Sequence, residues 1–154
     1  MTAYRIVPDD LSSAAVLELL QFHLDEMYQW SPPESVHAMP AERLRAADVS
    51  FYAAWDGEVL AAVGALKELG DGRGELKSMR ASPDFRGRGA GEAILLHLME
   101  EAGRRGYTWL GLETGRPDPF LPARRLYEKH GFAECAPFGD YVSDEFSMCM
   151  EKSL

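Results

Sequence analysis

The sequence is poor in the features that mark secreted and membrane-bound proteins. Its two cysteines, Cys135 and Cys149, are too few for the disulfide framework of a small secreted domain. The start of the chain lacks the apolar core of a signal peptide. The longest apolar run, Val59 to Leu66, is far shorter than the roughly 20 residues that a membrane-spanning helix needs. Low-complexity tracts and repeats are absent too, so we expect one cytoplasmic domain over residues 1–154 that does not contact a membrane.

Positive charge is also scarce. The chain has 16 lysines and arginines against 25 aspartates and glutamates, which gives a formal net charge of −9 at pH 7. Such a protein binds nucleic acid and anionic membranes poorly and suits a cationic substrate, although charge of this size also simply keeps proteins soluble. The basic residues of the second half stand out and suggest one anionic ligand. They are Arg80, Arg86, Arg88, Arg104, Arg105, Arg116, Arg124, Arg125 and Lys129.

Hydrophobic periodicity predicts hairpins followed by alternating strands and helices. Strands are expected over Tyr4–Val7, Val49–Trp55, Glu58–Leu69, Glu75–Ala81, Trp109–Thr114, from Phe132 onward and over Ser147–Lys152. Helices are expected from a cap at Asp9 or Asp10 to Met27, and over Pro40–Ala46, Gly89–Arg105 and Ala123–His130. This order favours an α/β or α+β fold in which helices cover the faces of a sheet.

The turn before the third of these helices has the composition of an anion site. Gly87, Gly89 and Gly91 alternate there, which lets the backbone approach a ligand closely and adopt positive φ. The helix that follows presents unpaired N–H groups and the positive end of its dipole. Arg86 and Arg88 add guanidinium groups that suit phosphate. The spacing matches neither a P-loop nor the G-x-G-x-x-G fingerprint, and a purely structural turn is the alternative interpretation.

Two motifs resemble those of the GNAT family of N-acetyltransferases. Arg86-x-x-Gly89-x-Gly91 matches the family's [Q/R]-x-x-G-x-[G/A] cofactor motif, and Ala123-x-x-Leu126-Tyr127-x-x-x-Gly131-Phe132 is similar to its second signature. One helix and one strand separate the two motifs, as they do in the family. The resemblance covers the chain from about Val49 to the C-terminus, and Leu112 to Gly115 further resembles a bacterial branch of small enzymes.

The resemblance implies a mixed, twisted sheet of six or seven strands flanked by about four helices, with strands four and five splayed apart at one end. Acetyl-CoA would be the cosubstrate, with no metal, and its pantetheine would pair with the backbone of Met79 and Ala81. The remaining cofactor contacts would come from Arg86, Gly87, Arg88, Gly89, Ala90, Gly91 and Ala123. Phe120 replaces the asparagine that contacts pantetheine in many relatives, so this contact is lost or made by other groups.

Acetyl transfer needs a base, because an alkylamine with a pKa of about 10.4 is charged at pH 7. Glu75 is the leading candidate, since it begins strand four at the spacing at which histone-acetylating relatives place their glutamate. Alternation along the strand predicts that Glu75, Lys77 and Met79 share a face, although a solvated strand-start glutamate fits the pattern as well. The other candidate bases are His23, Asp25, Glu26, His37 and Glu113.

Tyr127 is the candidate general acid, because the resemblance puts its hydroxyl near the cofactor sulfur. The alternative is that its ring only packs on the apolar face of the helix. We expect the acceptor site to include Trp30, Glu34 and His37, since an aromatic ring beside carboxylates suits a cationic amine. An ordinary capped loop would have the same composition.

Together these features predict an acetyl-CoA-dependent N-acetyltransferase that acts on a primary amine of a small molecule by direct transfer in a ternary complex. The alternatives are a protein-amine acetyltransferase and a catalytically idle acyl-CoA sensor. A nucleic-acid-binding module is disfavoured by the net charge of −9. Exposed edge strands leave room for a homodimer.

Overall fold

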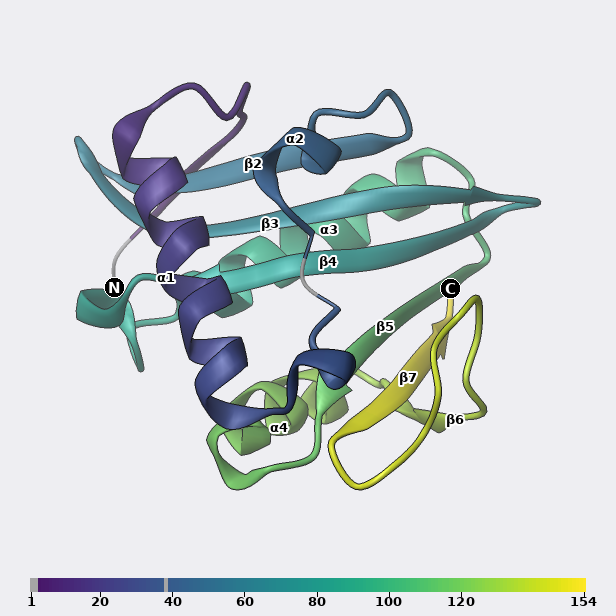
Figure 1. The fold of residues 1–154 in the computed structure, drawn as a ribbon. Helices are drawn as coiled ribbons and strands as arrows, with labels where there is room; N and C mark the ends of the chain where they lie inside the picture. The colour runs from purple at the N-terminus through teal and green to yellow at the C-terminus, as the bar shows by residue number, and fades with distance from the viewer. Residues whose placement is uncertain (1–2, 38) are drawn as a thin grey trace.

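The computed structural model describes residues 3–37 and 39–154 and contains a seven-stranded mixed sheet (Figure 1). The strands are ordered β1-β2-β3-β4-β5-β7-β6. Neighbouring β4 and β5 are parallel, and the other neighbouring pairs of this sheet are antiparallel. The strands are β1 (Arg5–Pro8), β2 (Val49–Asp56), β3 (Val59–Gly70), β4 (Arg73–Ala81), β5 (Trp109–Gly115), β6 (Ala133–Cys135) and β7 (Ser147–Ser153). The helices are α1 (Ala14–Trp30), α2 (Ala41–Leu44), α3 (Ala90–Arg104) and α4 (Leu121–Lys129), with short 3-10 turns at Pro33–Ser35, Pro83–Phe85 and Asp118–Phe120.

This arrangement confirms the expected mixed sheet with four helices. The cap of the first helix was wrong, however, because α1 is capped by Ser13, whose side chain accepts the Val16 N–H at 3.3 Å. Asp9 and Asp10 instead accept the N–H groups of the residues two positions on, at 2.9 and 3.1 Å. Aspartate commonly closes such local turns, so both side chains are used before the helix begins.

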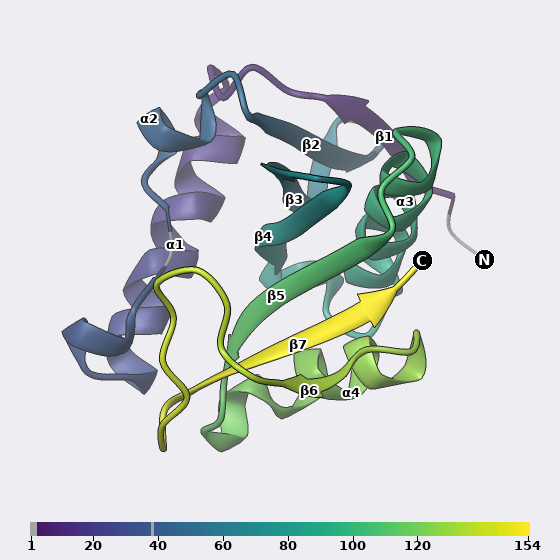
Figure 2. The ribbon, with the colours of Figure 1, turned by 90° about the vertical axis from the view of Figure 1, so that its right-hand side faces the viewer.

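The helices cover both faces of the sheet (Figure 2). On one face α1 and α2 pack on β2 and β3 through a buried cluster that includes Val16, Leu19, Leu20, Leu44, Phe51, Val63 and Ala65. On the other face α3 and α4 pack through a second cluster that includes Leu66, Leu76, Ile94, Leu95, Leu98, Leu112 and Tyr127. Each fully buried leucine or isoleucine contributes roughly 1.5–3 kcal/mol to folding. In the described residues, no helix has both the length and the apolar character needed to cross a membrane.

The sheet opens between its two parallel strands. β4 pairs with β5 at Arg73, Gly74 and Glu75 alone, opposite residues 109–111. Beyond Glu75, β4 continues along β3, while β5 continues along β7. The two strands therefore diverge, which confirms the splay expected between strands four and five.

A β-bulge lies in β4 at the start of this divergence. Arg80 pairs with Val63 and Lys77 with Ala65, so that Ser78 and Met79 together stand opposite Gly64. Ser78 has a φ of 55°, which lies in the left-handed region that serine rarely adopts. The extra residue shifts the alternation of side chains by one position.

The bulge corrects the prediction that Met79 shares a face with Glu75 and Lys77. A Cβ placed on Gly64 would lie 2.5 Å from Ile94 of α3 and 2.8 Å from the Met79 sulfur, so Met79 faces α3. Lys77 lies opposite Ala65, which belongs to the cluster under α1. Lys77 therefore points to the opposite face of the sheet from Met79.

Candidate functional site

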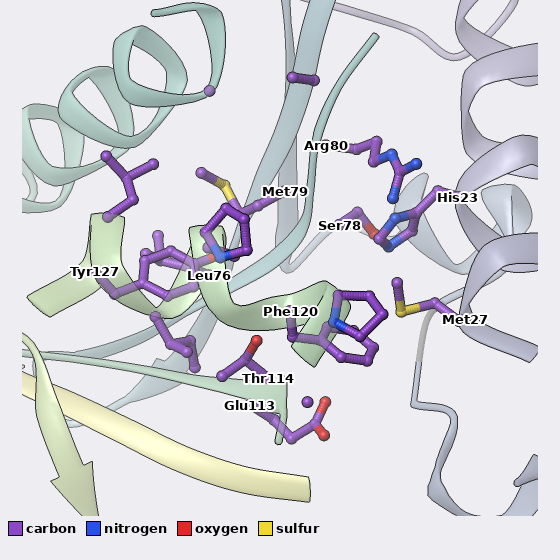
Figure 3. Close-up of a pocket in the computed structure, with 18 of the residues that line it drawn as sticks. His23, Met27, Leu76, Ser78, Met79, Arg80, Glu113, Thr114, Phe120 and Tyr127 are labelled. Carbon is purple, nitrogen blue, oxygen red and sulfur yellow. The ribbon is translucent and has the colours of Figure 1, made fainter. Parts of the chain in front are cut away.

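A cavity of about 830 Å³ occupies the region in which β4 and β5 diverge (Figure 3). Its lining comes from α1, residues 31–37, β4, the start of α3, β5, α4 and the loop before β7. Tyr127 and Met79 lie on the side of α3 and α4, whereas His23, Ser78 and Arg80 lie beside α1. The cavity therefore passes through the sheet and has walls on both faces.

One end of the cavity is an open backbone loop at the start of α3. Gly87 and Gly89 have φ values of 72° and 80°, and a Cβ on Gly87, Gly89 or Gly91 would meet nothing within 4 Å. The first backbone hydrogen bond of α3 runs from Ala93 N–H to Gly89. Among the described residues, no carbonyl accepts the N–H groups of residues 90–92. Unpaired N–H groups at a helix start form an anion site, so the loop fits a diphosphate.

The two arginines of this loop take different positions. Arg86 lines the cavity, and its Nη2 lies 3.2 Å from a Glu26 carboxylate oxygen. Arg88 stands outside the cavity lining, with its guanidinium 4.4 Å from the centre of the Phe85 ring and 3.8 Å from the carboxylate of Asp56. The side chain of Arg88 is thus turned away from the site predicted for it, while Gly87, Gly89, Ala90 and Gly91 line the cavity.

Tyr127 stands at the passage through the sheet. The residue is 7% exposed, and its ring packs edge-on against Phe132 at 6.0 Å, while Met79, Ala81 and Ala123 line the same cavity. Burial, and then the charge of Glu113, raise the pKa of the Tyr127 phenol well above its ordinary value of 10. No described residue forms a hydrogen bond with its hydroxyl. The phenol is therefore protonated at neutral pH and has its proton available to a ligand.

Glu75 lies in a buried hydrogen-bond network. Only 4% of the residue is exposed, and its Oε2 accepts the Tyr141 hydroxyl at 2.5 Å and the Lys77 ammonium at 3.2 Å. Lys77 also donates to the Tyr141 hydroxyl at 2.6 Å. Glu75 is therefore not the solvated strand-start residue of the alternative interpretation.

A second carboxylate, Glu113 of β5, points into the same cavity (Figure 3). Its Oε2 accepts the Ser147 hydroxyl at 2.6 Å. Burial raises the pKa of the Glu113 carboxyl, and the neighbouring charge of Glu75 adds to this, whereas Ser147, His37 and Lys77 oppose it. The two carboxylates and one lysine leave this end of the cavity acidic.

The three predicted acceptor residues divide into two groups. Trp30 and His37 line the cavity, with Trp30 edge-on to Phe120 at 5.3 Å and His37 edge-on to Tyr141 at 5.2 Å. Glu34 is exposed in the turn at Pro33–Ser35 and lies outside the lining. The aromatic residues of the predicted acceptor site therefore line the cavity. The carboxylates of Glu75 in β4 and Glu113 in β5 line it in place of Glu34.

Arg116 fixes the loop that brings Tyr141 to Glu75. Its Nε donates to the Asp144 carbonyl at 2.6 Å, and its Nη2 donates to Ser143 and Glu134 at 2.7 Å each. The loop is thereby tied to the end of β5 and to β6.

Sequence reasoning missed Tyr141, Ser78 and Arg80 as cavity residues. Tyr141 is separated from Glu75 by 66 positions and belongs to no motif, so no local signal marks it. Arg80 stood among the basic residues that suggested an anionic ligand, but no pattern placed it in this cavity. The position of Ser78 depends on the bulge, which the sequence does not reveal.

The chain is similar to known proteins along almost its whole length. Residues 16–132 match the model of the family described as Acetyltransferase (GNAT) family. The chain is 48% identical to the Uncharacterized N-acetyltransferase YsnE of Bacillus subtilis, covering 95% of this chain and 97% of that protein. It is 45% identical to the Uncharacterized N-acetyltransferase YedL of Escherichia coli, covering 98% and 95%. A Bacillus subtilis acetyltransferase solved in complex with CoA shares the fold, with a TM-score of 0.69, 18% identity and 99% of each chain covered.

Proposed function

Because the chain belongs to the acetyltransferase (GNAT) family and is an N-acetyltransferase, we propose that it moves the acetyl group of acetyl-CoA to a primary amine of a small molecule. The observation that carries the proposal is the continuous cavity that joins the loop at the start of α3 to the acidic pocket under α1. One cavity that spans both regions supports direct transfer in a ternary complex.

The residues present fit the cosubstrate. Acetyl-CoA supplies the acetyl group as an activated thioester. The open glycines and the free N–H groups of residues 90–92 suit its diphosphate, and Arg86 adds a positive charge at the cavity wall. The backbone of Met79 and Ala81 follows the passage through the sheet, and Ala123 lines it from α4. We propose that these groups hold the cofactor, with the Met79 N–H placed to stabilise the oxyanion.

The acidic pocket of Glu75 and Glu113 binds and deprotonates the amine in this proposal. Deprotonating an alkylamine at pH 7 costs roughly 4–5 kcal/mol, at about 1.4 kcal/mol per pKa unit. Glu75 takes this proton, directly or through one water, while Tyr141 and Lys77 hold its carboxylate in place. Glu113 is the alternative base, because burial raises the pKa of its carboxyl above the ordinary value. The protonated phenol of Tyr127 supplies the proton that the departing thiolate needs.

A thiol-release assay with acetyl-CoA and a panel of amines tests this function. Tyr127→Phe keeps the ring and removes only the hydroxyl, while Glu75→Gln and Glu113→Gln keep size and remove charge. We expect Tyr127→Phe and the variant of the true base each to lower kcat by about 10²–10⁴-fold. Calorimetric titration with CoA serves as the control and is expected to give wild-type affinity for each variant.

Two results would speak against the proposal. If CoA does not bind the folded wild type, the assignment of the loop is wrong. If CoA binds but wild type releases no thiol with any amine, the protein is better described as an acyl-CoA sensor. Wild-type rates from all three variants would leave the activity intact and refute the roles of Tyr127 and the carboxylates.

A further inference from the structure

A buried arginine lies in the cavity at the end opposite the acidic pocket. Arg80 of β4 lines the cavity beside α1, and its side chain is 9% exposed (Figure 3). Its guanidinium carbon lies 5.1 Å from the centre of the Phe22 ring and 5.8 Å from that of Trp30. Two aromatic rings therefore flank the guanidinium of a side chain that lines the cavity.

The charges around Arg80 do not cancel. Arg80 and Arg86 both contact the single carboxylate of Glu26. Burial and the charge of Arg80 lower the pKa of His23 from 6.5 to about 4, so this neighbour is neutral at pH 7. The pKa of Arg80 falls only to about 10, which leaves it charged. Glu26 therefore does not neutralise both arginines by itself.

Three buried polar atoms at this end lack a protein partner. They are Arg80 Nε, Ser78 Oγ and His23 Nδ1, and none forms a hydrogen bond with any described residue. A buried polar group left unpaired destabilises a protein by roughly 1–3 kcal/mol, so such groups usually have a bound partner. A guanidinium, a hydroxyl and a neutral imidazole can each donate a hydrogen bond, and together they suit an anion with several oxygen atoms.

Strand pairing places Arg80 and the helix that follows the phosphate loop on opposite faces of the sheet, and Arg86 of the loop reaches Glu26 from its own side. Arg80 lies opposite Val63, which belongs to the cluster under α1, whereas the loop at Gly87–Gly91 leads into α3 on the other face of the sheet. The acidic pocket of Glu75 and Glu113 lies on the α1 face as well, because Glu75 pairs with Gly111 and Glu113 follows two residues later. One face of the sheet thus holds a positive end and a negative end of the same cavity.

We propose that the acceptor is an amine that also carries a carboxylate, and that Arg80 binds this carboxylate together with Ser78 and His23. This inference rests on the proposed acetyl transfer, because it assigns the acceptor of that reaction. A single arginine matches a carboxylate, with one negative charge, better than a phosphate monoester, with nearly two. The amine lies toward Glu75 and Glu113, and the aromatic wall of Trp30 and Phe120 lies between the two ends.

Matched pairs of acceptors test the proposal. Each amino acid is compared with the amine that remains after loss of its carboxylate: phenylalanine with phenethylamine, lysine with cadaverine, and β-alanine with ethylamine. Ethanolamine phosphate represents the phosphate monoesters. We expect wild type to favour the carboxylate-bearing member of at least one pair by about 10- to 100-fold in kcat/KM, the usual worth of a charge-assisted hydrogen bond.

Arg80 variants connect this preference to the residue. In Arg80→Met, kcat/KM for the preferred amino carboxylate is expected to fall by about 10- to 100-fold, chiefly through KM. The kcat/KM for the decarboxylated partner should stay unchanged in this variant. A purely structural role of Arg80 would instead lower kcat/KM for both acceptors. Arg80→Lys keeps the charge and should retain part of the preference. Arg104→Met, on the outer surface of α3, is the matched control and should behave as wild type.

Binding measurements separate the possible failures. Calorimetric titration of the protein–CoA complex with the same amino carboxylates reports on Arg80 even if no acetyl transfer occurs, so failure of the proposed function does not hide the result. If Arg80→Met does not fold, Arg80→Lys and the preference of wild type still decide. Four results would each overturn the proposal. Wild type could acetylate both members of every pair at equal rates, or prefer ethanolamine phosphate. Arg80→Met could lose kcat/KM equally for both members of a pair, or bind CoA more weakly than wild type.

Discussion

The buried ring of His23 makes the stability of the protein depend on pH in a way that one substitution can isolate. Its Nδ1 is enclosed without a hydrogen-bond partner, and Arg80 lies beside it. Burial first, and then the charge of Arg80, lower its pKa from 6.5 to about 4. At pH values between about 4 and 6.5, the imidazole of His23 is protonated in the unfolded chain and neutral in the folded chain.

The sign and size of the effect follow from this difference. Stability from His23 is fully present above pH 6.5, falls as the pH drops toward about 4, and changes no further below that. The interval between 6.5 and about 4 corresponds to roughly 3 kcal/mol, at about 1.4 kcal/mol per pKa unit. This figure is an upper limit, because part of the His23 side chain faces the open cavity.

The assay is urea unfolding of wild type and His23→Gln at a series of pH values from 7.5 to 4. Carboxylates titrate in both proteins, so the difference between the two free energies of unfolding isolates the imidazole. We expect wild type to lose up to about 3 kcal/mol relative to His23→Gln over this range. If the two curves stay parallel from pH 7.5 to 4, His23 is not held neutral by burial, and the assigned charge of the Arg80 cluster is wrong as well.

Three further predictions address the loop, the bulge and the second carboxylate. Gly89→Ala forces an alanine to a φ of 80° at the start of α3, at a cost of about 1–2 kcal/mol. We expect this variant to bind CoA more weakly in calorimetric titration. Gly103→Ala lies within α3, where a Cβ would meet nothing within 4 Å, and should bind CoA like wild type. In Gly64→Ala the new Cβ would lie 2.5 Å from Ile94 and 2.8 Å from the Met79 sulfur. We expect a loss of about 1–3 kcal/mol in urea unfolding, and unchanged stability would contradict the close packing of Ile94 and Met79 against the bulge. Burial raises the pKa of Glu113, so wild type should lose stability relative to Glu113→Gln as the pH rises above 4.5, the opposite slope to that from His23.

Local sequence carried most of the fold. Strand and hairpin patterns placed each strand within about two residues of its observed bounds, because alternation and turn glycines act over short distances. The cap of α1 was misplaced because aspartate, like serine, suits both a turn and a cap, and the sequence does not say which role Asp9 and Asp10 take. The bulge at Ser78 left no local trace either, since its register is set by pairing with β3.

In the site as well, local motifs could be predicted from the sequence and contacts between distant segments could not. The glycine-rich turn before α3 and the helix with Tyr127 could be predicted because each is one continuous motif whose backbone geometry follows from its glycines and spacing. Tyr141 and the Arg80 cluster could not, because they depend on which distant segments the fold brings together. Arg88 shows the limit of a motif, since its position in the loop was right while its side chain turns to Asp56 and Phe85.

The bulge in β4 links these local and distant parts. In a regular strand Glu75, Lys77, Met79 and Ala81 would share one face, and Arg80 would point to α3. The extra residue at Ser78 reverses this order beyond Lys77, so that Met79 turns to the side of Tyr127 while Arg80 joins Glu75 and Lys77 under α1. A one-residue insertion in strand pairing thus places the cavity's positive and negative ends on one face and the part lined by Met79 and Tyr127 on the other. The positive φ at Ser78 is the conformational cost of that arrangement. A strand without the bulge would no longer place Arg80 on the same face of the sheet as Glu75.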